Sequence, residues 1–139
     1  EYFAKCLENK KEKYSEKELF YLFENDLRKF IGNVLNNEFN GDWWRKGIPT
    51  KIRVSCVARR EEGLDEEKDR DLILFANFYD YKGILENNKS EFSKHMNVKK
   101  WCSKLNELGP IRNTLAHNRD LDSAYEKIKN CYEELKKII

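Results

Sequence analysis

The sequence predicts an all-α fold. Only two prolines and six glycines interrupt the 139 residues, and the apolar residues recur at steps of three and four, the spacing typical of helices with one buried face. No segment keeps the strict alternation of a half-buried strand, and no internal repeat is evident. Because a chain of this length makes one ordinary domain, we expect a single helical domain over residues 1–139.

The N-terminal segment, residues 1–14, is expected to be an arm or a short helix. The chain begins with Glu1 rather than Met, so we also expect it to be a fragment of a longer protein. The first secure helix follows Ser15, whose hydroxyl can accept the backbone N–H of Glu18 in a capping box. Its predicted apolar stripe consists of Leu19, Leu22, Phe23, Leu27, Phe30, Ile31, Val34 and Leu35. The asparagine-rich residues 36–41 are predicted to end it.

Trp43 and Trp44 stand in the following connector. Adjacent tryptophans in a connector more often close the edge of a core than stack on nucleobases, so we favour the structural interpretation. Thr50 is predicted to cap a second helix through about Arg60. The buried residues expected on that helix are Ile52, Cys56 and Val57.

Residues 59–71 carry seven acids and four bases, which indicates a solvated helix end and loop. Residues 72–86 are strongly apolar. A strand is conceivable by periodicity, but the length and the absence of β-branched enrichment favour a buried helix. Residues 87–90 should break it, before short helices over 91–95 and 98–108.

Gly109-Pro110 predicts a kink or a tight break, because proline lacks a donor and clashes with the preceding turn. A helix over 111–117 follows, since proline suits the first helical position. Asp120 or Asp122 should cap the last helix. The expected buried face of that helix consists of Leu121, Tyr125, Ile128, Cys131, Tyr132, Leu135 and Ile138.

Composition excludes several classes of protein. A net charge of +2 argues against a polybasic coat for nucleic acids, although residues 94–139 alone hold ten bases and six acids. No run of about 18 apolar residues and no signal peptide is evident, so the cytoplasm is the expected compartment. Four isolated cysteines, without zinc-ligand spacing, predict free thiols in a reducing compartment.

One run of residues suits phosphodiester chemistry. Residues 111–119 place Arg112, Asn113, His117, Asn118 and Arg119 close together. A histidine can move protons near neutral pH, and a guanidinium can grip a phosphate at two points. On a helix Asn113 and His117 share a face, whereas Arg112 and His117 diverge by about 140°. Convergence therefore needs the long arginine side chain, or a helix that loosens near Asn118.

The Arg112-x4-His117 run resembles the R-x4-6-H motif of the HEPN superfamily. The apolar first helix, the two tryptophans and residues 78–85 (Phe-Tyr-Asp-Tyr-Lys-Gly-Ile-Leu) are similar to its Swt1-like branch. The resemblance covers about residue 19 to the C-terminus, and the Arg-His motif is its most specific part. Gly109-Pro110 departs from a continuous motif helix.

The resemblance implies an all-α HEPN-like bundle of about five to six helices that dimerises and brings two motifs to one cleft. Active members are metal-independent endoribonucleases, so no cofactor is expected. Carried over by position, Arg112 would bind or polarise the phosphate, His117 would transfer protons, and Asn113 would be the polar residue after the motif arginine. Asn118, Arg119 and Asp80 would contact the RNA substrate, with Asp80 alternatively a structural carboxylate.

Two functions follow from this resemblance. The first is a ribonuclease of toxin, defence or RNA-processing type, with RNA, a second copy, other domains or an antitoxin as its partners. The second is a non-catalytic HEPN module for dimerisation, or for RNA or nucleotide binding, inside a larger protein. A third interpretation is purely structural, with His117 paired inside the core.

Overall fold

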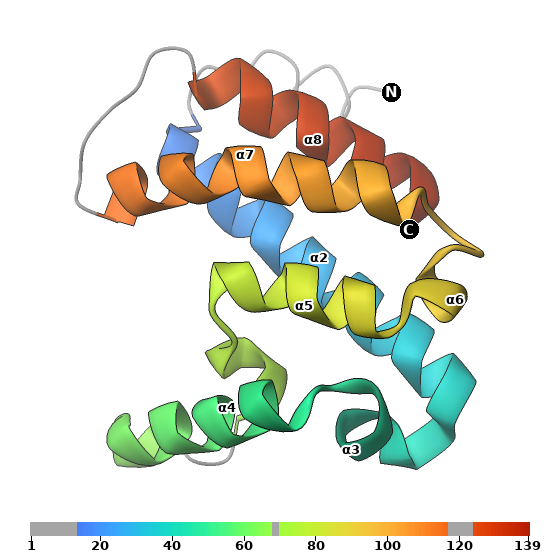
Figure 1. Ribbon diagram of the computed structural model, residues 1–139. Helices are drawn as coiled ribbons and strands as arrows, with labels where there is room; N and C mark the ends of the chain where they lie inside the picture. The colour runs from blue at the N-terminus through green and yellow to red at the C-terminus, as the bar shows by residue number, and fades with distance from the viewer. Residues whose placement is uncertain (1–13, 68–69, 117–123) are drawn as a thin grey trace, which may run out of the picture.

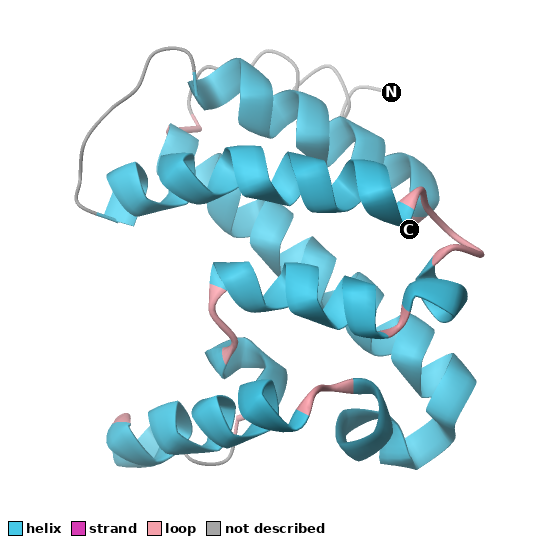
Figure 2. Ribbon diagram, viewed as in Figure 1, coloured by secondary structure: helices cyan, strands magenta, loops and turns pink. Residues whose placement is uncertain are grey.

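A computed structural model describes residues 14–67, 70–116 and 124–139. Within these residues the chain forms helices joined by short loops, and no strand is present (Figure 2). The five longer helices are α2 (Glu16–Phe39), α4 (Thr50–Glu62), α5 (Phe78–Asn87), α7 (Val98–Ala116) and α8 (Ala124–Ile138). The shorter elements are α3 (Trp43–Gly47), α6 (Lys89–Phe92) and the 3-10 turns η2 (Asn40–Asp42), η3 (Asp65–Glu67) and η4 (Leu72–Phe75). The all-α prediction is confirmed.

Helix α2 is the central element of the bundle (Figure 1). It packs against α8 and α7 on one side and against α3, α6 and η4 along the rest of its length, while α5 packs on α7. Ser15 caps it by accepting the N–H of Glu18 at 3.1 Å, as the sequence predicts. The helix continues past residue 36 and ends at Phe39, where Asn40 has a φ of 56°, a conformation that asparagine tolerates better than most residues.

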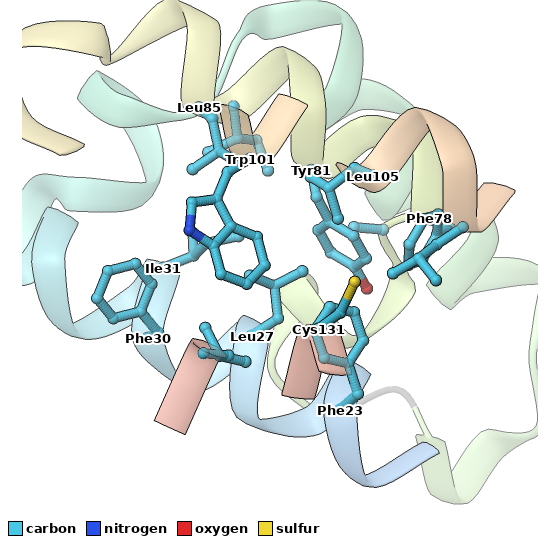
Figure 3. Close-up of a cluster of buried hydrophobic side chains, with 14 of the residues drawn as sticks. Phe23, Leu27, Phe30, Ile31, Phe78, Tyr81, Leu85, Trp101, Leu105 and Cys131 are labelled. Atoms are coloured by element: carbon cyan, nitrogen blue, oxygen red, sulfur yellow. The ribbon is translucent and has the colours of Figure 1, made fainter. Parts of the chain in front are cut away.

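The core forms where α2, α5, α7 and α8 meet (Figure 3). Apolar residues at helical spacing on each element point inward, which is the pattern that the sequence displayed. The side chains labelled there are Phe23, Leu27, Phe30, Ile31, Phe78, Tyr81, Leu85, Trp101, Leu105 and Cys131. Cys56, Cys102 and Cys131 are free thiols inside the bundle, and burial raises the pKa of each. Cys6 lies outside the described residues.

The tryptophan connector is itself helical. Trp43 and Trp44 open α3 and pack, half-buried, against the core, as the structural interpretation expects. Asn88 holds the end of this helix, because its amide donates to the carbonyls of Gly47 at 2.7 Å and Ile84 at 2.8 Å. This buried amide fixes α3 against the end of α5.

The start of α4 differs slightly from the prediction. Pro49 is the N-cap and Thr50 is the first helical residue, whose hydroxyl accepts from Arg53 rather than from the backbone. Ile52 and Cys56 are buried, but Val57 is 41% exposed. Only one face of α4 meets the bundle, and Val57 lies outside it.

Residues 72–86 are not one helix. They form η4, an extended link at Ala76 and Asn77, and then α5. The break has a local cause, because the carboxylate of Asp80 accepts the N–H of Asn77 at 2.8 Å and so starts a new helix. The Arg59 side chain reinforces the link by donating to the Phe75 carbonyl at 2.6 Å.

Of the predicted alternatives at Gly109-Pro110, the tight break is absent, and α7 continues through Pro110 as one helix. The residue before a proline usually avoids the helical region because its Cβ meets the proline ring, and Gly109 has no Cβ. Pro110 is exposed, so the carbonyl left without a donor one turn earlier can be hydrated. Glycine before proline therefore permits the helix here.

The described part of α8 begins at Ala124, and the proposed caps Asp120 and Asp122, together with Leu121, lie outside the described residues. Ile128, Cys131 and Leu135 are buried as predicted. Within the described residues, no helix has the length and apolar character needed to cross a membrane.

Candidate functional site

The last turns of α7 carry the first half of the Arg-His motif. Arg112 and Asn113 are described, and the helix continues to Ala116, directly before His117. His117, Asn118 and Arg119 lie outside the described residues. The structure therefore gives the geometry of the site around Arg112 and Asn113.

Arg112 faces the N-terminal half of α2. Its Nε lies 3.9 Å from Oε1 of Glu24, and its side chain is 42% exposed. Glu24 itself is buried, with 8% of its surface exposed. A buried carboxylate requires partners to offset its desolvation, and Arg112 supplies one from a different helix.

The other oxygen of Glu24 is held by two groups from inside the bundle. The Tyr81 hydroxyl donates to Oε2 at 2.7 Å, and Nη2 of Arg28 donates to the same oxygen at 3.1 Å. Arg28 closes the cluster because its Nε donates to the Tyr81 hydroxyl at 2.7 Å. The carboxylate is therefore fixed on one side and turned toward Arg112 on the other.

Burial and electrostatics keep the Tyr81 hydroxyl of this cluster protonated. Burial, and then the charge of Glu24, raise the pKa of Tyr81 well above its ordinary value. The hydroxyl thus remains a donor at any physiological pH. One carboxylate faces two guanidinium groups, which leaves one positive charge in excess beside the solvent-facing Arg112.

Arg112 also borders a hollow of about 320 Å³ between α2 and α7. Its lining combines two cations, one carboxylate, two aromatic rings and an aliphatic side chain: Lys17, Phe20, Tyr21, Glu24, Arg112 and Leu115. Tyr21 is 63% exposed, so its ring is open to a ligand. The volume is at the lower end of the range usual for small-ligand sites.

Asn113 points elsewhere. Its Nδ2 donates to the hydroxyl of Tyr79 on α5 at 3.1 Å, and it does not line the hollow beside Arg112. Adjacent helical residues are separated by about 100° around the axis, so the two side chains leave α7 in different directions. The structure brings Asn113 to Tyr79 and Arg112 to Glu24.

Asp80 has the contacts of a structural carboxylate. Besides capping α5, it lies 3.4 Å from Nη1 of Arg59 on α4. It does not border the hollow beside Arg112. The described residues also contain no group of three or more histidine, cysteine or acidic side chains placed to hold a metal ion.

A family model described as Swt1-like HEPN matches residues 18–138. The chain belongs to the Swt1-like HEPN family. The match extends from the first turn of α2 to the end of α8, so it includes nearly all of the described bundle and the Arg-His motif. The comparisons matched no curated protein and no solved structure.

Sequence reasoning missed the residues that hold the motif arginine in this HEPN module. Glu24 falls within the apolar register of α2, one residue after Phe23 and four before Arg28. A carboxylate on the buried face of a helix, with an arginine one turn later, is the signal that could have identified it. Tyr81 offered no such signal, because a buried tyrosine resembles any other core aromatic.

Proposed function

We propose that this HEPN module is a metal-independent endoribonuclease that cleaves RNA by attack of a ribose 2′-hydroxyl on the adjacent phosphate. The observation that carries the proposal is the placement of Arg112. It is solvent-facing, borders a hollow, is held by a buried carboxylate and stands at the end of the helix that leads to His117.

Arg112 would bind the phosphate and stabilise the charge that develops on it. Its ion pair engages Nε, and within the described residues its two terminal nitrogens have no other protein partner. Those nitrogens suit two-point binding of phosphate oxygens. The attraction of the buried Glu24 carboxylate keeps the guanidinium near this position before the substrate arrives, which lowers the cost of reorganisation in the transition state.

His117 would transfer the protons. Cleavage requires one proton to leave the 2′-hydroxyl and another to reach the departing 5′-oxygen. The products are a 2′,3′-cyclic phosphate and a new 5′-hydroxyl. Because each chain supplies one motif histidine, we propose a homodimer in which two motifs share a cleft and the two histidines divide these roles.

The test is cleavage of a mixed RNA pool in EDTA by the purified chain. We expect cuts with cyclic-phosphate ends, and a loss of about 10²–10⁴-fold in rate for His117→Ala. His95→Ala is the matched control, since His95 is the other histidine of the chain and is exposed on the surface. Absence of EDTA-resistant cleavage, or equal cleavage by His117→Ala, would refute the proposal.

A non-catalytic role is the second candidate, and the Arg112–Glu24 ion pair favours it. This pair joins α7 to α2, so Arg112 can serve the bundle or bind RNA without turnover. Arg112→Ala should then weaken RNA binding or dimerisation, measured by titration and native mass spectrometry, with no cleavage to lose. Cleavage that depends on His117 would exclude this candidate.

A further inference from the structure

A second hollowed surface lies around Trp43 and runs along α2 from Asn25 to Asn36. Two adjoining hollows, of about 520 Å³ and 460 Å³, share Trp43, Asp71 and Ile73 in their linings. We call them together the Trp43 groove. None of its lining residues borders the hollow beside Arg112, so the two surfaces are separate.

The larger hollow lies between α2 and η4 and is rich in amides. Asn25, Asn33 and Asn36 line it from successive turns of α2, and Lys29 lies between them. Gly32 lies among these side chains on α2 and leaves open space beside Trp43. A Cβ added at Gly32 would have the Trp43 ring as its nearest neighbour, at 4.0 Å. Side-chain amides offer both donors and acceptors, which is the combination that reads the edge of a nucleobase.

The smaller hollow is cationic. Arg60 and Arg70 line it together with Trp44, and Nη1 of Arg60 donates to the Arg70 carbonyl at 3.2 Å, which links the two residues. Nε of Arg60 is buried and has no hydrogen-bond partner among the described residues. A buried donor without a partner is unusual and costly.

Two aromatic side chains lie where the two hollows adjoin: Trp43 lines both, and Trp44 lines the smaller one. The Trp43 and Trp44 rings pack edge to face, with centroids 5.8 Å apart and an interplanar angle of 89°. Both are half-buried and anchored on the core, so the exposed part of Trp43 is held in place. A rigid indole ring can stack on any of the four nucleobases, because each base has a flat π-face.

The net charge of the groove favours an anion. Lys29, Arg60 and Arg70 have no ion pair among the described residues, and Asp71 is the carboxylate in the lining. Arg28, which also borders the larger hollow, shares its charge with Glu24. Cations next to an aromatic ring and amides suit a ligand with both a phosphate and a nucleobase.

We propose that the Trp43 groove binds a phosphorylated nucleotide, with the base beside Trp43 and the α2 amides and the phosphate at Arg60 and Arg70. The same chemistry is offered by a free mononucleotide and by one unit of an RNA strand. The site does not depend on cleavage at Arg112 and His117. It would hold a ligand whether the module is a nuclease or a binding domain.

The experiment is a titration of the full chain monitored by tryptophan fluorescence, in the His117→Ala background so that RNA stays intact. Adenosine, AMP, ATP and a five-nucleotide RNA are the probes. AMP should quench the fluorescence and bind about ten-fold more tightly than adenosine, because the phosphate adds charge-assisted hydrogen bonds. Tighter binding of the RNA than of AMP identifies a strand as the natural ligand, and tighter binding of AMP or ATP identifies a free nucleotide.

Two variants and a control localise the binding. Arg60→Ala and Arg70→Ala should each weaken AMP binding about ten-fold, and Arg70 is exposed, so its variant should fold even if that of Arg60 does not. Arg45→Ala is the matched control, because Arg45 is an exposed cation of α3 that lines neither hollow. Equal affinity for adenosine and AMP, no binding at millimolar concentration, or equal losses for Arg45→Ala and Arg70→Ala would overturn the proposal.

Discussion

Tyr81→Phe should destabilise the bundle strongly, although it removes a single oxygen atom. That hydroxyl donates to Glu24 at 2.7 Å and accepts from Arg28 at 2.7 Å, and Tyr81 has no exposed surface. Hydrogen bonds to charged groups contribute about 1.5–3 kcal/mol each. Phenylalanine keeps the ring, so no large cavity adds to the cost.

The expected loss is smaller than the sum of two such bonds. The Arg28 side chain is 16% exposed, so water can replace part of what its Nε loses, while Glu24 keeps its bond from Arg28 and its ion pair with Arg112. We therefore expect about 2–4 kcal/mol of lost unfolding free energy, and a melting temperature lower by about 10 °C for a domain of this size.

Urea unfolding followed by circular dichroism measures this loss, with Tyr21→Phe as the matched control. Tyr21 is on the exposed side of α2, so its variant should change the unfolding free energy by less than about 0.5 kcal/mol. A loss below about 1 kcal/mol for Tyr81→Phe would refute the reasoning that this hydroxyl fixes Glu24.

Three other substitutions test separate parts of the structure. Gly109→Ala adds the Cβ that clashes with a following proline ring and places it 2.7 Å from the Tyr79 ring. That ring is 55% exposed and can move, and alanine favours the helix by about 1 kcal/mol. We therefore expect a net loss of about 1–3 kcal/mol of unfolding free energy, measured by thermal unfolding; an unchanged unfolding curve would contradict the role given to this glycine. Asp80→Ala removes the carboxylate that completes the capping box of α5 and should cost about 1–2 kcal/mol of unfolding free energy, measured by urea unfolding. It should leave any RNA cleavage rate of the folded protein unchanged; a large loss of that rate would instead assign Asp80 to the substrate. Burial, and then the hydrogen bond to Asp26, raise the pKa of Tyr132. The folded state therefore keeps a proton that the unfolded state releases above about pH 10. The free energy of unfolding should fall as the pH rises beyond that value. Urea titrations from pH 8 to 11 should show a shallower fall for Tyr132→Phe, and identical slopes for the two proteins would contradict the assignment.

Local signals in the sequence were sufficient for most helices and for the core. The capping hydroxyl of Ser15 and the apolar spacing of α2 and α8 act within one or two turns, so they can be recognised without knowing what packs against them. The Arg-His motif was equally visible, and the Swt1-like HEPN family that it suggested is confirmed.

The secondary structure predicted from two local patterns was wrong, because each pattern is compatible with a second backbone structure. The apolar run over 72–86 conceals a capping pair, Asn77 and Asp80, that divides it. Gly109-Pro110 usually breaks a helix, yet a glycine before the proline also removes the steric clash that makes the break necessary. Sequence spacing did not distinguish these solutions.

The sequence by itself determined the helical class, the buried faces and the identity of the motif residues, because these depend on periodicity and residue chemistry along the chain. Only the tertiary structure decided what surrounds Arg112. Glu24 and Arg28 come from α2, Tyr81 comes from α5, and Arg112 comes from α7. Their convergence results from how three helices pack, and a buried carboxylate is tolerated there because the packing supplies its partners.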